Sequence, residues 1–554
     1  MKNIFALISF LSLSISSFAQ WSTDSLQNTL VRYADSAAIY PLVATAPNGN
    51  TFVAWYEQTQ NHYIEKMQLF DVTGHRLWDT AGLLISDHEQ DSTIFDSYIA
   101  CDHDGNVIFS FQDRRSGPIY PVVYKLDESG NFLWGADGIQ LHDTSSDFQG
   151  NPQICIFDNN DMLITWVSGN SHSHVAYEKI NADGTLPWAS SKSVYDPIKH
   201  FTKGVSIPQS GGKFLMAYVD EVPAEPYSGI VYANRFDSNG DPVWAQPTKI
   251  SGDSILVYVF PIPINDGKNG MFVSWLSLNE QDHSYLDSRM QHIDSTGVNL
   301  LGANGAQIAD IPNMSDILQS IVYVPDSNQL VALLQVENVA ETESGISIQK
   351  ISADGAPLWG VTGKQLIEPT DLNFPDAASI VLANQSVLVF YTEQTSNIDI
   401  LLLKLKGFNV DLNGNILWHE SISAVDSHKG EITAGSFMND QVIAFWKDER
   451  SGVFSIYAQN VSSEGNLGPA FVAPAENSFV NVYPSLTDAI IYVEENHSSG
   501  PSEFALIDLF GKRIITQKMK SGTNEIDLSS LPAGLYLYEL QTTSGIVSGK
   551  IMKQ

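Results

Sequence analysis

Residues 126–134 read L-D-E-S-G-N-F-L-W, and close copies of this phrase recur along most of the chain. The copies are F-D-V-T-G-H-R-L-W ending at Trp78, I-N-A-D-G-T-L-P-W at Trp188, F-D-S-N-G-D-P-V-W at Trp244, I-S-A-D-G-A-P-L-W at Trp359 and V-D-L-N-G-N-I-L-W at Trp418. Aligned on the glycine of the phrase, eight units appear, at Gly74, Gly130, Gly184, Gly240, Gly297, Gly355, Gly414 and Gly465. A regular period of about 56 residues indicates a repeat architecture.

The second unit shows the pattern inside a repeat. Apolar or β-branched runs at 98–101, 107–111, 119–126 and 132–134 alternate with short turns rich in Gly, Asn and Asp. Those turn residues supply the positive backbone dihedral angles that tight reversals need. Four antiparallel strands in each repeat predict an all-β fold, an eight-bladed β-propeller over residues 20–470. Seven blades remain the alternative if the weak unit at 297–301 is degenerate.

The two ends of the repeat region predict how such a ring would close. Trp21 lies one repeat before Trp78, whereas the last unit has Leu467-Gly468 where most others have tryptophan. We therefore expect the N-terminal strand to complete the eighth blade. Pairing of this kind removes the free sheet edges that otherwise promote aggregation.

With four steps from glycine to tryptophan, the phrase resembles the tryptophan-docking repeat of quinoprotein-like eight-bladed propellers and their non-catalytic relatives. An indole at this place can bury roughly 150–250 Å² against the next blade. Cys101 and Cys155 are not the vicinal pair that quinoprotein dehydrogenases often carry, so no quinone is predicted. They occupy equivalent positions in adjacent units, usually too far apart for a disulfide. A sialidase Asp-box has three steps rather than four, which disfavours a sialidase.

After residue 468 the repeat ends, and residues 471–479 are predicted to be a linker. Residues 480–554 alternate β-rich runs with Gly or Pro turns, which predicts a small β-sandwich. This block closely resembles the type A C-terminal sorting domain of the type IX secretion system of Bacteroidetes. The markers are D-L-F-G-K at 508–512, D-L-S-S-L-P-A-G-L-Y at 527–536 and the terminal Lys550 to Lys553. Pro484-Ser485-Leu486 departs from the usual Pro-Asn-Pro.

The N-terminal residues 1–19 have the pattern of a signal peptide. Lys2 precedes a mostly apolar run at 4–13, and Ser17-Phe18-Ala19 is a small-x-small site before Gln20. With the sorting-domain resemblance, this pattern implies passage to the periplasm and then export by the type IX machinery, so that the mature protein is secreted or on the outer-membrane surface. No later stretch is apolar for long enough to span a bilayer. We expect the protein to be a monomer.

Composition and motifs narrow the function. With 63 acidic and 29 basic residues the net charge is −34, so nucleic-acid binding is not expected. No phosphate-binding loop, nucleophile elbow or zinc-binding helix is present, and neither a cofactor nor a metal is predicted. His172 and His174 share one face of an extended stretch but lack a third ligand.

The non-repeating loops that join second to third strands, and blade to blade, lie on one face and are the candidates for function. Examples are 220–228, 280–288, 337–344 and 368–376. Two further loops match each other, D-R-R-S-G at 113–117 and D-E-R-S-G at 448–452. Their candidate binding residues are Asp113, Arg115, Asp448 and Arg450. The competing interpretation is that each aspartate caps its own loop through the arginine.

We expect an extracellular binding or adhesion module for glycan or protein, and more a binding protein than an enzyme. The alternative is a polysaccharide hydrolase or lyase with its site at the mouth of the propeller channel. Two inward carboxylates about 5–10 Å apart, beside an exposed Trp or Tyr, would favour the enzyme.

Overall fold

The computed structural model describes residues 21–33, 35–60, 62–90, 96–144, 148–169, 172–222, 228–252, 260–279, 284–371, 374–396, 398–468, 480–483, 486–487, 489–495, 502–507, 512–520, 522–542 and 545–554. The contacts divide the chain into two compact units, Met1–Ala470 and Phe471–Gln554. The predicted signal peptide and linker lie outside the described residues.

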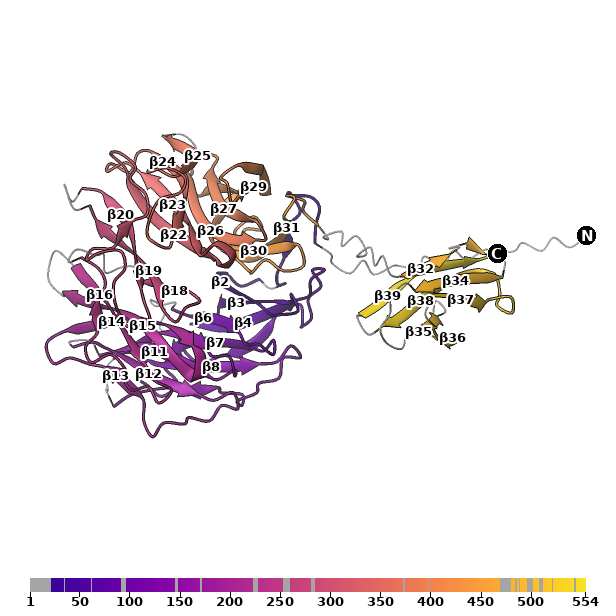
Figure 1. Ribbon diagram of the computed structural model, residues 1–554, viewed down its shortest axis with the longest axis horizontal. Coiled ribbons are helices and arrows are strands. Elements are labelled where there is room, and N and C mark those ends of the chain that lie inside the picture. The colour runs from indigo at the N-terminus through magenta and orange to yellow at the C-terminus, as the bar shows by residue number, and fades with distance from the viewer. Residues whose placement is uncertain are drawn as a thin grey trace, which may run out of the picture. The chain divides into compact units, whose positions relative to one another are not determined.

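The first unit is built from small antiparallel sheets in a propeller-like arrangement (Figure 1). Six sheets have four strands in chain order. The first sheet holds β2 (Ala38–Thr45), β3 (Thr51–Gln58), β4 (Tyr63–Phe70) and β5 (Leu83–Ser86), and the second holds β6 (Tyr98–Cys101), β7 (Val107–Asp113), β8 (Tyr120–Leu126) and β9 (Ile139–Gln140). The third holds β10 (Gln149–Ile156), β11 (Met162–Ser168), β12 (His174–Ile180) and β13 (Lys192–Val194), and the fourth holds β14 (His200–Gln209), β15 (Lys213–Val222), β16 (Ser228–Phe236) and β17 (Thr248–Lys249). The fifth holds β18 (Ile262–Asn265), β19 (Met271–Leu278), β20 (Leu286–Ile293) and β21 (Ala306–Gln307), and the sixth holds β22 (Ser315–Val324), β23 (Gln329–Glu337), β24 (Ser344–Ser352) and β25 (Lys364–Thr370). Short 3-10 turns at Ser210–Gly212 and Pro325–Ser327 lead into β15 and β23.

A further sheet of the first unit has seven strands, in the order β1-β31-β30-β29-β28-β27-β26. Its members are β26 (Pro375–Ala383), β27 (Ser386–Gln394), β28 (Leu402–Asp411), β29 (Ile416–Ala434), β30 (Gln441–Asp448), β31 (Ser455–Ser462) and β1 (Thr29–Leu30). The 19-residue β29 belongs to two groups of strands. It pairs with β28 up to His428 and with β30 from Lys429 onwards.

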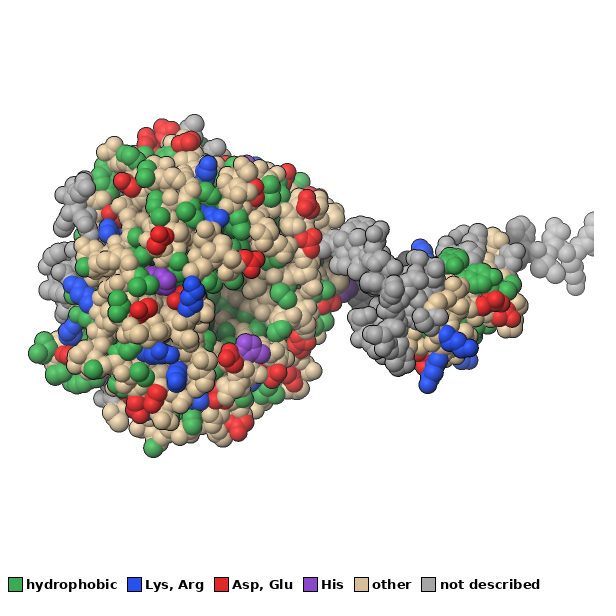
Figure 2. Space-filling view, in the orientation of Figure 1, with side chains coloured by type: hydrophobic (Ala, Val, Ile, Leu, Met, Phe, Trp, Pro, Cys, Tyr) green, Lys and Arg blue, Asp and Glu red, His purple; other side chains and the backbone are tan. Residues whose placement is uncertain are grey.

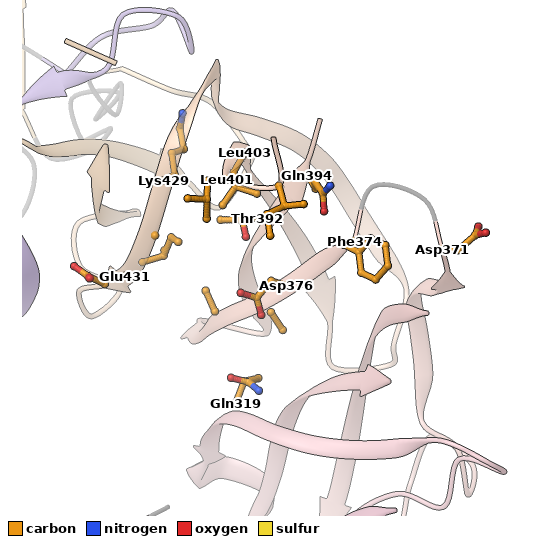
Figure 3. Close-up of a pocket in the computed structure, with 15 residues that line it drawn as sticks. Gln319, Asp371, Phe374, Asp376, Thr392, Gln394, Leu401, Leu403, Lys429 and Glu431 are labelled. Atoms are coloured by element: carbon orange, nitrogen blue, oxygen red, sulfur yellow. The ribbon is translucent and has the colours of Figure 1, made fainter. Parts of the chain in front are cut away.

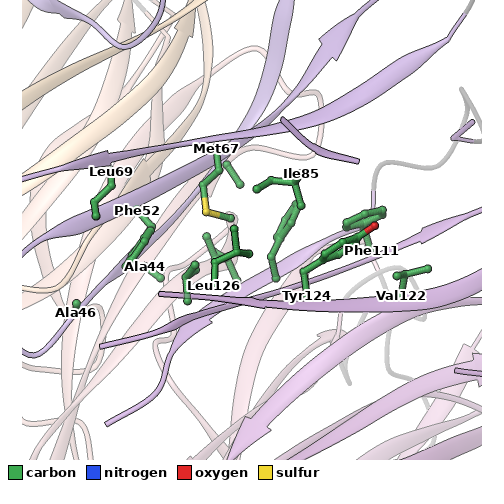
Figure 4. Packing of buried hydrophobic residues seen from close by; sticks show 14 residues of the cluster. Ala44, Ala46, Phe52, Met67, Leu69, Ile85, Phe111, Val122, Tyr124 and Leu126 are labelled. Carbon is green, nitrogen blue, oxygen red and sulfur yellow. The ribbon is translucent and has the colours of Figure 1, made fainter. Parts of the chain in front are cut away.

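The second strand of each sheet is buried on both faces, because each sheet packs between its neighbours. Every residue of β7 and of β11 is buried, for example. The hydrophobic core is therefore a series of layers between sheets. Figure 4 shows one layer, in which Phe52 and Met67 of the first sheet face Tyr124 and Leu126 of the second.

The repeated tryptophans pack on the turn glycine of the following repeat. Trp78 Nε1 donates to the carbonyl oxygen of Glu128, at 2.9 Å, and Trp418 Nε1 donates to that of Ser463, at 2.8 Å. A Cβ atom on Gly184 would lie 2.5 Å from the Trp134 ring, and this glycine has a φ of +88°. The turn therefore needs glycine both for its backbone angle and for the close approach of the indole.

A glutamine clamp, formed by Gln68, Gln291 and Gln349, recurs on the third strand of three sheets. Each glutamine Nε2 donates at 2.7 Å to the carbonyl oxygen eleven residues further on. Each Oε1 accepts from the next backbone N–H and from the N–H of the residue in the tryptophan position. The clamp thus holds the segment after the repeat phrase against its own sheet.

The predicted pairing of the N-terminal strand with the last repeat is present. β1 pairs antiparallel with β31, with Thr29 opposite Ala458 and Leu30 opposite Tyr457. Gln459 on β31 donates through Nε2 to the carbonyl oxygen of Ser22 at 2.7 Å, the same contact that Gln68 makes with Asp79. The N-terminal segment therefore supplies the part of the repeat that the last unit lacks.

The second unit contains two sheets around one core. A three-stranded sheet holds β32 (Val480–Tyr483), β34 (Ile490–Glu495) and β37 (Gly522–Asp527), and a five-stranded sheet holds β33 (Leu486–Thr487), β39 (Gly545–Lys553), β38 (Gly534–Thr542), β35 (Glu503–Ile507) and β36 (Arg513–Lys518). Ile491 and Ile526 of the smaller sheet share a buried cluster with Phe504 and Leu540 of the larger. Residues 508–511 of the first sorting marker lie outside the described residues.

Cys101 and Cys155 are both free, as expected from their separation. In the described part of the chain, no helix combines the length and the apolar character that crossing a membrane requires.

Candidate functional site

The first predicted site pair, Asp113 and Arg115, forms a closed loop cap. Arg115 donates to the Asp113 carboxylate through Nη2 at 2.6 Å and through Nε at 2.8 Å. The arginine also bonds the Tyr124 hydroxyl at 2.9 Å and the carbonyl oxygen of Asp137. Asp113 is fully buried. These contacts match the loop-capping interpretation, and a contact with ligand stays a prediction.

The second pair, Asp448 and Arg450, makes the same cap and carries more contacts. The Asp448 carboxylate is fully buried and also lies 3.2 Å from the Lys429 Nζ. Ser427 Oγ and Trp446 Nε1 donate to it at 2.7 and 2.9 Å. Burial alone would raise the pKa of Asp448, but the hydrogen bonds and charges of Arg450 and Lys429 hold it below its usual value.

Arg450 also fastens the N-terminal strand to the last repeat. Its Nη1 donates to Asn28 Oδ1 at 3.0 Å, directly before β1, and its Nη2 donates to Ser423 Oγ at 2.9 Å. Asn28 in turn donates to Gln459 Oε1 at 3.0 Å. The arginine therefore joins three segments that meet where the sheets close.

A cavity of about 820 Å³ lies between β22 of one sheet and β26 to β29 of the seven-stranded sheet. We call it the inner-strand cavity. Its lining is Gln319, Asp371, Phe374, Asp376, Ala377, Ala378, Thr392, Gln394, Ile400, Leu401, Leu403, Lys429, Gly430, Glu431 and Ile432. Figure 2 shows the surface of the first unit hollowed near its centre, and Figure 3 shows side chains of β22, β26 and β29 around the cavity. Residues 371, 374 and 376 fall in the segment 368–376 that the sequence assigned to the functional face, although Asp376 lies in β26.

Bulges in the first strands shape this lining. The register shifts between Leu318 and Ser320, between Ala377 and Ser379, and between Gly430 and Thr433, and each extra residue lines the cavity. Related shifts occur in β2, β10 and β14. Bulges of this kind re-aim side chains and are common beside functional sites.

Four of these bulges place a non-glycine residue at positive φ, namely Tyr40 and Glu431 at 53°, Asn151 at 57° and Lys203 at 53°. The left-handed region costs energy for tyrosine, lysine and glutamate, and such strain clusters at binding sites. The strain at Glu431 is held by two contacts of its carboxylate. Lys447 Nζ and the Tyr40 backbone N–H each lie 2.5 Å from it.

The polar lining of the cavity is acidic. Part of Asp376 reaches solvent, but the protein around the carboxyl group displaces water from it and so raises its pKa. Burial also raises the pKa of the neighbouring Glu337, with added repulsion from Glu341 and Asp376. Lys429 is the one basic residue of the described lining. Its ammonium is turned to Asp448, and burial lowers its pKa to about 8. The cavity thus offers acceptors rather than a free cation.

Sequence reasoning missed Gln319 and Glu431 because both lie on strands rather than in the loops it singled out. The described lining contains Phe374 as its one aromatic ring and neither Trp nor Tyr. The aromatic half of the feature expected of a glycan-cleaving enzyme is therefore absent from this lining.

Comparison with known proteins assigns the C-terminal unit. Residues 481–554 match the family model described as a secretion system C-terminal sorting domain. The match implies that the chain is exported through the type IX secretion system to the cell surface or beyond. A search of the curated proteins gave no match.

Solved structures resemble the chain only distantly. An ulvan lyase, from a new family of polysaccharide lyase, is 11% identical with a TM-score of 0.45, over 80% of this chain and 98% of its own. The β-propeller domain of the trilobed protease from Pyrococcus furiosus is 9% identical with a TM-score of 0.39, over 70% and 98%. A protein of unknown function from Dyadobacter fermentans is 12% identical with a TM-score of 0.36, over 78% and 96%.

Proposed function

We propose that this chain is an exported β-propeller that binds a neutral glycan in the inner-strand cavity. The observation that carries the proposal is the lining, in which carboxylates, amides and a hydroxyl surround one phenyl ring and the one basic side chain is already paired. Carboxylate and amide oxygens accept the hydroxyl groups of sugars, and a ring gives an apolar face to stack on. A polyanionic glycan would meet Asp371, Asp376 and Glu431 with no cation to balance its charge.

We also infer eight blades for the propeller. The 19-residue β29 divides between two groups of strands, so the seven-stranded sheet is read as two four-stranded blades that share this strand. The eighth blade then consists of the second half of β29 with β30, β31 and β1. Eight tight-turn glycines, each in contact with a tryptophan or a leucine of the preceding repeat, support the same count.

A hydrolase acting on polysaccharide is the second candidate function. Glu431 forms an ion pair with Lys447, whereas burial raises the pKa of Asp376, and a carboxyl group with a raised pKa suits a general acid. Release of reducing ends from a bound glycan would identify the enzyme. Binding without release would identify the binding module.

Asp376→Asn and Glu431→Gln are each expected to weaken glycan binding about 10- to 100-fold, because a hydrogen bond to a charged group contributes about 1.5–3 kcal/mol. The ligand is first sought with the full chain on an array of neutral and anionic glycans, and its affinity is then measured by calorimetry. Asp183→Asn, on an exposed tight turn away from the cavity, is the matched control and should leave affinity unchanged. Unchanged affinity in both cavity variants, or selective binding of anionic glycans, would refute the proposal.

Deletion of residues 480–554 is expected to abolish delivery to the surface and medium and to leave the protein in the periplasm. The first unit has its own core, so it should stay folded without the second. Fractionation with an antibody to the first unit gives the readout. As the reciprocal test, the same residues fused to a periplasmic reporter should carry the reporter out. Surface delivery of the truncated chain would contradict the export role.

A further inference from the structure

The sheet formed by β10 to β13 departs from the glutamine clamp. Glu178 on β12 stands at the clamp position, six residues before Gly184, as Gln68 stands before Gly74. Its Oε1 accepts the Lys179 backbone N–H at 3.0 Å, as a clamp glutamine would. An ionised carboxylate has no hydrogen to donate, so it cannot make the second clamp bond, to the carbonyl oxygen of residue 189.

The segment after the third repeat phrase lacks one backbone contact with its sheet, because Pro187 has no N–H to donate where Leu77 donates to the carbonyl oxygen of Leu69. Six repeats have a β-bridge across the turn, such as Phe70 with Arg76 and Ile351 with Pro357. Among the described residues no such bridge joins Ile180 to Leu186, and Leu186 is 44% exposed. A cavity of about 370 Å³ opens at this point. Its volume equals that of on the order of ten water molecules, which is enough for a small organic ligand.

The walls of this cavity come from two neighbouring sheets. They include the carboxylate of Glu178, the indole rings of Trp166 and Trp188, the imidazoles of His142 and His174, and Lys192. His142, Ser190 and Ser193 are exposed, so the cavity opens to solvent. Glu178 is 3% exposed and lines the wall, and within the described residues its hydrogen bond to the Lys179 N–H uses only the first carboxylate oxygen.

The basic groups around Glu178 already have partners. Lys192 Nζ lies 2.6 Å from the Asp241 carboxylate, Lys179 Nζ lies 2.9 Å from that of Asp161, and His174 Nε2 lies 2.6 Å from Asp143 Oδ2. An ionised carboxyl at this depth is costly without a cation of its own. The indole of Trp188 already attracts one ammonium, because Lys192 Nζ lies 5.2 Å from the ring centre.

We propose that this cavity is a binding site for a small molecule with a protonated primary amine, whose N–H groups take the donor role that the glutamine amide has in the three clamped sheets. The ammonium would bond the second oxygen of Glu178 and supply its missing counter-charge. Indole rings and the serine side chains of 190–193 would surround the rest of the molecule. The site is separate from the inner-strand cavity and does not depend on the function proposed for it.

Binding is expected to strengthen with rising pH. Burial raises the pKa of Glu178 to about 7, although Lys192 opposes the shift, and an ammonium binds only the ionised form. Lys192 from β13, His174 from β12, and His142 and Asp143 from the preceding sheet are the charged or titratable groups that face Glu178.

The test uses the full chain and two probes of similar size, ethanolamine hydrochloride and ethylene glycol, at equal ionic strength. Ethanolamine is expected to raise the melting temperature at pH 8 and to raise it less at pH 5.5, with no rise from ethylene glycol. Calorimetry at pH 8 should show at least tenfold weaker ethanolamine binding to Glu178→Gln. This variant restores the clamp residue and is expected to fold. Asp376→Asn, in the other cavity, should bind ethanolamine like the parent protein.

Several results would overturn the proposal. They are no response to ethanolamine at pH 8, an equal response to ethylene glycol, and undiminished ethanolamine binding in Glu178→Gln. A response lost in Asp376→Asn but kept in Glu178→Gln would move the amine site to the inner-strand cavity.

Discussion

Asp448→Ala is expected to lower the free energy of unfolding of the first unit by about 3–5 kcal/mol, the usual cost of breaking a buried ion pair. The lost carboxylate is the shared partner of Lys429 and Arg450, and the Lys429 side chain is fully buried. Both cations would remain without their counter-charge. All 11 tryptophans lie between Trp21 and Trp446, so tryptophan fluorescence during urea unfolding of the full chain reports this unit alone.

Asp113→Ala is the matched control, because it removes the same aspartate from the other copy of the loop. Its cost should be smaller, about 1–3 kcal/mol, since no lysine loses a partner and Arg115 keeps its bonds to Tyr124 and to residue 137. Asp113 also repels the buried Glu65 and raises the pKa of that carboxyl, after burial itself. Removing Asp113 relieves this repulsion. Equal losses of unfolding free energy in the two variants would show that the contact between Asp448 and Lys429 adds no stability.

The cap inside each of these loops could be predicted from sequence, because an aspartate and an arginine two residues apart meet whatever the rest of the fold does. The additional partners of Asp448, which Asp113 lacks, could not be predicted from sequence. Arg450 reaches Asn28 across 422 residues, and that contact exists only once the N-terminal strand has paired with the last repeat. Lys429 reaches Asp448 because the two residues are opposite each other on β29 and β30, which is a matter of strand register.

Dependence on strand register also explains why the sequence did not indicate Gln319 and Glu431 in the inner-strand cavity. The repeat phrase was visible because the same glycine and tryptophan contact recurs in successive repeats, and it correctly indicated small sheets and closure by the N-terminus. Glu431 lies inside the longest strand of the chain, and nothing in the sequence marks where β29 passes from one group of strands to the next. One extra residue at a bulge also reverses which side chains face the cavity.

Trp21→Ala is expected to cost about 3–5 kcal/mol, as much as removing a tryptophan from the middle of a core. Trp21 is 2% exposed although it is the first residue that the structure describes, and a Cβ atom on Gly74 would lie 2.8 Å from its ring. Its Nε1 donates to the carbonyl oxygen of Val72, two residues before that glycine, at 3.3 Å. Trp78 Nε1 makes the equivalent bond to the carbonyl oxygen of Glu128 at 2.9 Å. The indole therefore occupies the place that the last repeat leaves without a tryptophan.

Trp78→Ala is the internal control, and the two losses should agree to within about 1 kcal/mol if the N-terminal segment is a structural part of the ring. The signature of Trp21→Ala is faster proteolysis near Thr29 and Leu30 under native conditions, because β1 lies at the edge of its sheet, beside β31. Trp78→Ala should leave that cleavage rate unchanged. A cost below about 1 kcal/mol for Trp21→Ala, beside a full cost for Trp78→Ala, would mean that the ring holds together without its N-terminal strand. The loss of stability and the local cleavage together would show that the segment beginning at Trp21 completes the last repeat, which is more than 430 residues away in the chain. The bond from Gln459 to Ser22 joins the same two segments.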